Sequence, residues 1–144
     1  MILIDANLLI WAQVNSFPLH NDARSWLDRL LSSDGRVGIP WSSLLAFLRV
    51  VTNPRVLERP VTAADACSQM QKWLAHELVW VPEPTPHHGE VISHLLRQTG
   101  AAGNLVPDAH LAALAIEHHL TLYSADSDFA RFPGLRWINP LAGR

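Results

Sequence analysis

The chain begins with MILIDANLLI (residues 1–10), in which a short apolar run from Ile2 to Ile4 ends at the carboxylate of Asp5. An apolar run of this length that stops at a turn-forming residue is typical of a strand buried on both faces, as in a parallel sheet. Because open parallel sheets bind ligands beyond the carboxyl ends of their strands, Asp5 occupies a position typical of a functional residue. The structural alternative is that Asp5 only starts a turn or caps the helix that follows.

The rest of the chain alternates short apolar runs with segments of helical periodicity. Further strands are predicted at 36–39, 78–81, 120–124 and 135–138, and helices at 8–13, 21–31, 44–51, 63–76, 88–99 and 107–118. This alternation predicts an α/β fold, a three-layer α/β/α sandwich around a mostly parallel central sheet. The length of 144 residues predicts a single domain, 1–144.

Composition narrows the classes of protein that this chain can belong to. Cys67 is the only cysteine, which excludes an internal disulfide and a cysteine-built zinc site. The formal net charge of -2 does not indicate a basic nucleic-acid-binding surface, so any such contact must come from a local patch or a metal ion. The sequence has no signal segment and no apolar run long enough to span a membrane, so we expect a cytoplasmic protein.

Three further acids follow the position of Asp5. Asp126 and Asp128 come after the apolar strand at 120–124, and Asp108 opens a helix directly after Pro107. Each has an ordinary alternative, because acids favour the first turn of a helix and Asp-Ser-Asp is a common turn. In a parallel sheet, however, Asp5, Asp126 and Asp108 would meet at one edge, where crowded carboxylates need a cation. An all-oxygen site of this kind suits Mg²⁺ or Mn²⁺ and predicts phosphodiester hydrolysis.

Five blocks of sequence, in this order, resemble one known family. They are LIDANLL (3–9), FLRVVTNPRV (47–56), PDAHLAALA (107–115), SADSDF (124–129) and LRWINPL (135–141). The pattern is similar to that of PIN-domain proteins, and in particular to the VapC-type toxins of bacterial toxin–antitoxin systems in their mycobacterial branch. The resemblance covers nearly the whole chain.

The resemblance implies a PIN-like fold, a homodimer and a Mg²⁺-dependent endoribonuclease that cuts a loop of transfer or ribosomal RNA. It also implies a cognate VapB antitoxin whose tail covers the active site. By this match Asp5 and Asp108 are the first-choice metal ligands, and Asp126 corresponds to the fourth acid of the family. Asp128 is a nearby auxiliary acid, and Asn7 corresponds to the polar residue that supports the first acid.

One position departs from the family pattern. Many PIN nucleases carry a glutamate just before the FLR block, where this chain has Ala46. The alternative function is therefore a PIN-fold module that binds RNA or protein with weakened catalysis. Ser42 or Ser43, one turn earlier, could hold a metal-bound water in place of the missing acid. Arg49 could clamp a substrate phosphate, or could be a solvated arginine.

Three other hypotheses concern His110, the helix at 107–118 and the fold class. His110 could donate a hydrogen bond to an acid of the site, or could be a core or interface histidine. The helix is apolar almost all round, so its excess apolar surface predicts contact with a twofold mate. A phosphate-accepting receiver domain also places acids at strand ends, but it needs a lysine there, and Lys72 falls within a predicted helix.

Overall fold

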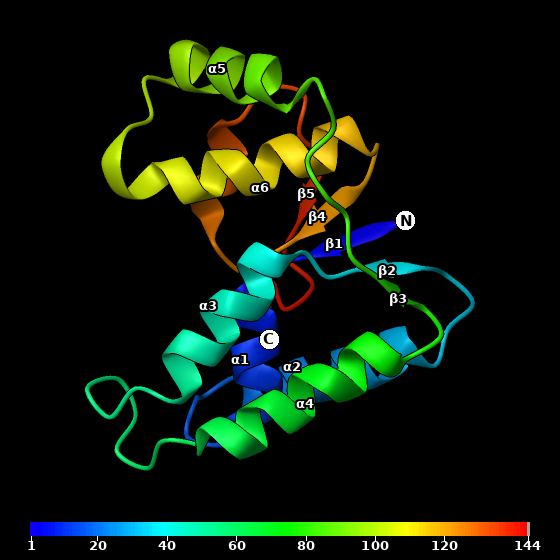
Figure 1. Cartoon of the computed structure of the whole chain (residues 1–144), viewed down its shortest axis with the longest axis vertical. Coiled ribbons are helices and arrows are strands. Elements are labelled where there is room, and N and C mark those ends of the chain that lie inside the picture. The colour runs from blue at the N-terminus through cyan, green and yellow to red at the C-terminus, as the bar shows by residue number, and fades with distance from the viewer. Residues whose placement is uncertain (144) are drawn as a thin grey trace.

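A sheet of five parallel strands lies at the centre of the computed structural model, which describes residues 1–143 (Figure 1). The strands are β1 (Ile2–Ile4), β2 (Val37–Gly38), β3 (Val79–Trp80), β4 (Thr121–Tyr123) and β5 (Trp137–Ile138). Their order, β3-β2-β1-β4-β5, places β1 in the middle, hydrogen-bonded to β2 on one side and to β4 on the other. The predicted parallel α/β sheet is confirmed.

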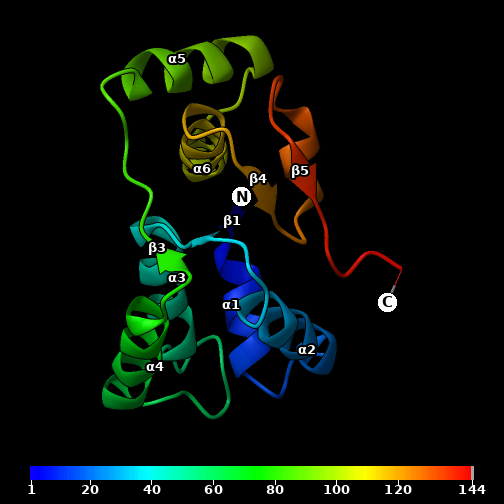
Figure 2. The same ribbon diagram turned by 90° about the vertical axis from the view of Figure 1, so that its right-hand side faces the viewer.

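Helices cover both faces of this sheet. They are α1 (Ala6–Gln13), α2 (His20–Leu31), α3 (Trp41–Val51), α4 (Ala63–Ala75), α5 (His88–Thr99) and α6 (Val106–Glu117), with two short 3-10 helices, η1 (Gly103–Leu105) and η2 (Ser127–Arg131). Figure 2 shows α5 and α6 on one side of the strands and α1 to α4 on the other. The predicted three-layer sandwich is therefore confirmed.

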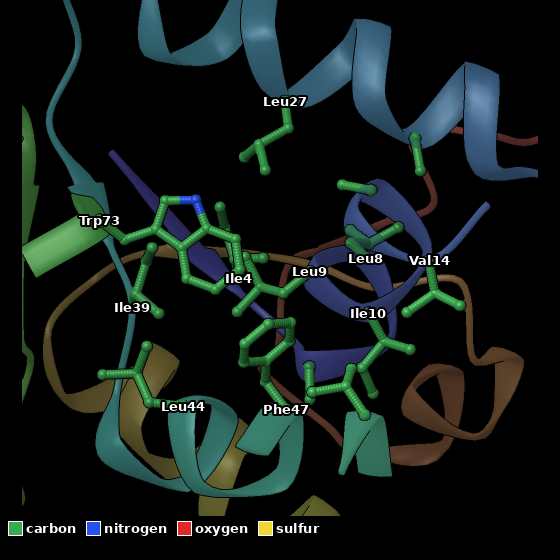
Figure 3. Packing of buried hydrophobic residues seen from close by; sticks show 14 of the residues in the cluster. Ile4, Leu8, Leu9, Ile10, Val14, Leu27, Ile39, Leu44, Phe47 and Trp73 are labelled. Carbon is green, nitrogen blue, oxygen red and sulfur yellow. The ribbon is translucent and has the colours of Figure 1, made fainter. Parts of the chain in front are cut away.

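The alternation of side chains along β1 divides the interior into two cores. Ile4 is fully buried among residues of α1, α2, α3 and α4, whereas Leu3 is fully buried among residues of α5, α6 and η2. In the first core, Phe47 of α3 meets Trp73 of α4 edge to face, with ring centroids 4.8 Å apart (Figure 3). The two cores hold α3 and α6 in place on opposite sides of the same strand end.

Two helices begin earlier than their periodicity predicts. Helix α1 begins at Ala6 rather than residue 8, because the side chain of Asp5 accepts a hydrogen bond from the Ala6 N–H at 2.7 Å. Helix α3 begins at Trp41 rather than residue 44, because the carbonyl of Pro40 accepts from the N–H groups of residues 43 and 44. Apolar spacing alone misses such first turns, since their side chains face the site or solvent.

Helix α6 does not offer the surplus apolar surface that its sequence predicts. Its apolar side chains from Ala109 to Ala115 are buried within the chain itself, with Leu111 5% and Leu114 1% exposed. Helix α5 packs against it on the side away from the sheet. The argument for a dimer contact through this helix is therefore wrong, and the homodimer stays a prediction from the resemblance.

One glycine permits a close approach that matters below. A Cβ atom on Gly38 of β2 would lie 2.8 Å from Cγ of Pro82 and 3.0 Å from the carbonyl oxygen of Ile2. Only glycine lets Pro82, and with it the connection from β3 to α5, pack this tightly on the sheet. None of the helices in residues 1–143 combines the length and apolar character that crossing a membrane requires.

Candidate metal centre

Three acids from two separate segments gather at the carboxyl edge of the sheet. Asp108, Asp126 and Asp128 each offer a carboxylate oxygen, and these oxygens lie within 4.8 Å of one another. Asp108 lies in the first turn of α6, whereas Asp126 caps η2 by accepting a hydrogen bond from the Asp128 N–H at 2.8 Å. The turn after β4 and the start of α6 therefore supply one cluster.

Asp5 reaches the same place from the end of β1. It lines a pocket of about 200 Å³ together with Asp108, and α3 closes the opposite side with Ser42, Ala46 and Arg49. The structure thus brings together Asp5, Asp108 and the acids after β4, as the parallel sheet predicts. Whether they hold a metal ion stays a prediction.

The electrostatics of the cluster indicate a need for a cation. Burial, followed by the negative charges of Asp126, Asp5 and Asp128, raises the pKa of Asp108 to about 6, against a smaller lowering by Arg131. Burial also raises the pKa of Asp5, although hydrogen bonds from Ser124 and Ala6 oppose the rise. Four carboxylates make an all-oxygen donor set, which fits Mg²⁺ or Mn²⁺.

Ser124 is a site residue that the sequence reasoning missed. It is fully buried at the end of β4, and its hydroxyl donates to Oδ2 of Asp5 at 2.6 Å. The Oγ atom of Ser124 also accepts hydrogen bonds from Nδ2 of Asn7 at 3.2 Å and from the N–H of Asp126 at 3.0 Å. Ser124 therefore fixes the first acid relative to the acids after β4, and Asn7 acts through it. The available signal was a polar residue placed directly after a buried strand.

Replacing Ser124 by alanine should lower cleavage activity by about 10- to 100-fold, the usual cost of losing a hydrogen-bond partner of a metal ligand. The variant also leaves the Asp126 N–H and the Asn7 amide without their acceptor, which costs about 1–3 kcal/mol of folding stability. Initial cleavage rates and urea unfolding measure the two effects. Ser127→Ala is the matched control, since Ser127 is exposed on the same turn. Equal behaviour of the two variants would contradict the role of Ser124.

The residues of α3 divide into two groups. Ser43 also lines the acidic pocket, but its buried hydroxyl donates to the carbonyl oxygen of Ile4 at 2.7 Å and so ties α3 to β1. Ser42, Ala46 and Arg49 line the acidic pocket. Ala46 therefore stands at the pocket wall, and Arg49 is the cationic side chain that α3 presents there.

His110 does not support the acids in the way considered above. Its Nδ1 lies 3.0 Å from Nε2 of His88, and the other nitrogen of His88 contacts the Glu117 carboxylate. Burial, and then the neighbouring His88, lowers the pKa of His110. The hypothesis that His110 donates to a site acid is therefore not supported by its contacts.

Comparison with known proteins places these observations in a family. Residues 2–135 match the PIN domain. The chain is 42% identical to Ribonuclease VapC37 of Mycobacterium tuberculosis over 142 residues, which cover 99% of both chains. It is 38% identical to Ribonuclease VapC33 of the same organism over 141 residues, which cover 98% of this chain and 99% of VapC33.

Solved structures share the fold at lower identity. The VapBC2 structure from Rickettsia felis, bound to a DNA fragment from its promoter, has a chain that matches with a TM-score of 0.71 and 19% identity, covering 96% of this chain and 98% of that one. The sarcin–ricin-loop-cleaving toxin VapC20 of Mycobacterium tuberculosis matches with a TM-score of 0.68 and 17% identity, covering 94% and 99%. The chain therefore belongs to the PIN-domain family, in the branch whose curated members are named VapC ribonucleases.

Proposed function

We propose that this chain is a Mg²⁺-dependent endoribonuclease and the toxin of a VapBC-type toxin–antitoxin pair. The observation that carries the proposal is the convergence of Asp108, Asp126 and Asp128 within 4.8 Å, together with the pocket that Asp108 shares with Asp5. The full-length similarity to named VapC ribonucleases supports the activity. Mn²⁺ satisfies the same ligands and is the alternative ion.

Each residue of the pocket has a distinct part in this proposal. Asp5, Asp108 and Asp126 would hold the ion, with Asp128 as an auxiliary ligand. Such an ion, when bound, lowers the pKa of a water and stabilises negative charge on the phosphoryl group. Ser124 keeps Asp5 in register with the other acids. Arg49, on the facing helix, is placed to attract the substrate phosphate.

The products follow from the nucleophile that we propose. Water attacks the phosphorus, and the ribose 2′-hydroxyl takes no part, so the ends are a 5′-phosphate and a 3′-hydroxyl. Sequence-selective recognition of RNA favours loops, whose unstacked bases a protein can reach. A loop of transfer or ribosomal RNA is therefore the proposed substrate class.

The proposed partner is a VapB-type antitoxin. Two of the similar solved structures are VapBC complexes bound to DNA, from Rickettsia felis and Salmonella typhimurium. We propose that an antitoxin tail covers the acidic pocket of this chain and blocks RNA. A pocket lined by Asp5 and Asp108, with the carboxylates of Asp126 and Asp128 close to Asp108, predicts that the covering segment brings its own positive charge.

Ala46 removes one acid from the pocket wall without separating the others. The binding-only alternative would be favoured if the remaining carboxylates were dispersed, yet they lie together and raise the pKa of Asp108. We therefore propose that catalysis needs no acid at position 46. Ala46→Glu is the corresponding test, because a silent wild-type protein that gained Mg²⁺-dependent cleavage would favour the binding-only alternative.

The test of the proposal is cleavage of total RNA by the wild-type protein in Mg²⁺, in EDTA, and by the Asp5→Asn variant. We expect cleavage only by the wild-type protein in Mg²⁺, with 5′-phosphate ends mapped by sequencing. Asp34→Asn is the matched control, because Asp34 is an exposed acid in the loop after α2. Cleavage that persists in EDTA and in Asp5→Asn would refute the proposal.

A further inference from the structure

A second pocket lies beside the acidic one. Its volume is about 230 Å³, and it is lined by α3 with Trp41 and Ser42, by the connection from β3 to α5 with Glu83, and by α6 with His110. Ser42 lines both pockets. Residues 107, 110, 111 and 114 share one face of α6 at helical spacing. Residues 107 and 111 line the acidic pocket, whereas residues 110 and 114 line this one. The two pockets therefore adjoin along the contact between α3 and α6.

The wall formed by the connection from β3 to α5 is fixed in place. Pro82 packs on Gly38, and the carbonyl of Glu83 accepts a hydrogen bond from Nε2 of His118 at 2.7 Å. Thr85 donates to the Glu117 carboxylate from its N–H at 3.0 Å and from its hydroxyl at 2.6 Å. Figures 1 and 2 show this connection running past α6 on its way to α5. The pocket is thus preformed and does not depend on a mobile loop.

The same carboxylate orders the imidazole that lines the pocket. Glu117, whose side chain is 2% exposed, pairs with Nδ1 of His88, and Nε2 of His88 pairs with Nδ1 of His110. Because a carboxylate can only accept, the proton between Glu117 and His88 belongs to the histidine. The rings of His88 and His110 lie edge to face with centroids 4.9 Å apart, which holds the His110 ring against the wall of the pocket.

The remaining lining is mostly apolar, with one aromatic side chain, Trp41, and it carries no lysine or arginine. Trp41 is a large apolar residue that is 43% exposed, and prolines 40, 82 and 84 form the neighbouring walls. The volume of about 230 Å³ lies below the roughly 300–1,000 Å³ of pockets for drug-sized ligands, which suits one nucleobase. A carboxylate in the wall disfavours a phosphate group. Flat aromatic surface beside hydrogen-bond acceptors is the chemistry that holds an unstacked base.

We propose that this second pocket binds the nucleobase next to the scissile phosphate, and that it selects guanine. The base stacks on Trp41, while the N1–H and the exocyclic amine of guanine donate to the carboxylate of Glu83. The imidazole of His110 forms the wall at the edge of the same base. Guanine is favoured because no other RNA base places an imino and an amino donor side by side for one carboxylate. The inference rests on the proposed ribonuclease function and names its substrate preference.

The test is cleavage of single-stranded RNA pools of randomised sequence, with the base on each side of the cut read by sequencing. We expect guanine enrichment on one side of the cut for the wild-type protein. Glu83→Gln should reduce the ratio of guanine to other bases by on the order of tenfold, since an amide offers one acceptor where guanine needs two. The ratio of guanine to other bases is measured, and not the total cleavage, because removing the negative charge of Glu83 raises the binding of every RNA.

Stacking is tested separately. Trp41→Ala should lower kcat/KM by on the order of tenfold, the usual loss when a stacking aromatic is removed, and Trp41→Phe should restore most of it. Leu45→Ala is the matched control, since Leu45 is 57% exposed on the same helix and lines neither pocket. Thermal unfolding checks that all three variants fold.

Binding without cleavage separates this inference from the proposed function. Labelled tetranucleotides that differ only in one base are titrated in Mg²⁺ against Asp5→Asn protein, with and without Trp41→Ala. If the guanine oligonucleotide binds more tightly than the others, and Trp41→Ala abolishes this preference, the result supports guanine binding in the second pocket even if the protein cuts no RNA. Equal binding of all four oligonucleotides, an unchanged ratio in Glu83→Gln, or a Trp41→Ala protein that matches Leu45→Ala overturns it while leaving the ribonuclease proposal intact.

Discussion

Replacing Asp108 by asparagine is expected to abolish cleavage and at the same time to stabilise the metal-free protein. Loss of one ligand removes several kcal/mol of charge stabilisation in the transition state, which corresponds to a fall of about 10²- to 10³-fold in rate. Stability changes in the opposite direction, because the variant keeps the shape of the side chain but removes one of the crowded negative charges. If Asp108 were needed only for folding, its replacement would lower cleavage activity and folding stability together.

The size of the stability gain follows from the raised pKa. A rise from 3.8 to about 6 for Asp108 corresponds to roughly 3 kcal/mol at 1.36 kcal/mol per unit. Because Asp108 is only partly buried, solvent screening reduces this to about 1–2 kcal/mol. Its place in the first turn of α6 opposes the gain, since a carboxylate there is worth about 0.3–1 kcal/mol. A net gain of about 1 kcal/mol is expected.

Urea unfolding in EDTA at pH 7 measures the gain, and initial rates on RNA in Mg²⁺ measure the loss. Asp34→Asn serves again as the control, because it removes the same charge from an exposed loop. An Asp108→Asn protein that unfolds more easily than the wild type would contradict the repulsion on which the metal centre depends.

A divalent ion is expected to stabilise the wild-type protein at pH 7 by up to about 4 kcal/mol at a thousandfold excess over its Kd, and to lose this effect in acid. The sign for the metal-free protein follows from the folded pKa of Asp108, which is raised above the unfolded value of 3.8. The carboxyl is neutral in both states below about pH 3, well under the unfolded value of 3.8, and causes no repulsion there. As the pH rises to about 6, the unfolded state ionises first and stability falls.

Other groups oppose this trend, so the comparison must isolate Asp108. The pKa of Glu117 is lowered by hydrogen bonds from Thr85 and His88 that outweigh its burial, and the pKa of His110 is also lowered, so both contribute stability that is lost in acid. The difference in unfolding free energy between wild type and Asp108→Asn cancels these contributions. In EDTA we expect the difference to be near zero at about pH 3 and to reach its full value above about pH 6.

Adding Mg²⁺ should reverse the order of the two proteins at pH 7, because only the wild-type protein has the complete ligand set. At pH 5 the ion must displace the proton from Asp108, so its effect should be much smaller. Thermal unfolding across this pH range, with Ca²⁺ and Mn²⁺ as comparison ions, measures the linkage. Equal stabilisation of wild type and Asp108→Asn by Mg²⁺ would place the ion elsewhere.

Periodicity and strand-end logic were sufficient to predict the fold and the meeting of the acids. Ile2 to Ile4 reads as a doubly buried strand because both faces of β1 are covered, and parallel pairing then brings the ends of β1 and β4 to one edge. The long apolar helix α6 was predicted correctly but interpreted incorrectly. Its sequence could not reveal that α5 covers it, since that packing depends on where α5 folds back.

The contacts that hold the site were beyond sequence reasoning for a different reason. Ser124 lies 119 residues from Asp5, and a single hydroxyl-bearing residue forms no sequence pattern that would predict its hydrogen-bond partner. Likewise Glu117, His88 and Thr85 belong to three segments that pattern alone cannot place together. Polar networks of this kind depend on angles and on distances of a few ångströms. Sequence patterns specify only which face of a helix or strand is buried and where the helix or strand ends.

The central position of β1 has a consequence during synthesis of the protein. Strand β1 pairs with β4, whose residues 121–123 are synthesised long after residues 2–4. Before this segment has emerged from the ribosome, Asp5 lacks both its hydrogen-bond partner Ser124 and the acids that follow Ser124. The site is therefore assembled only after the segment from β4 to Asp128 has been synthesised, and a product truncated before residue 120 cannot form it.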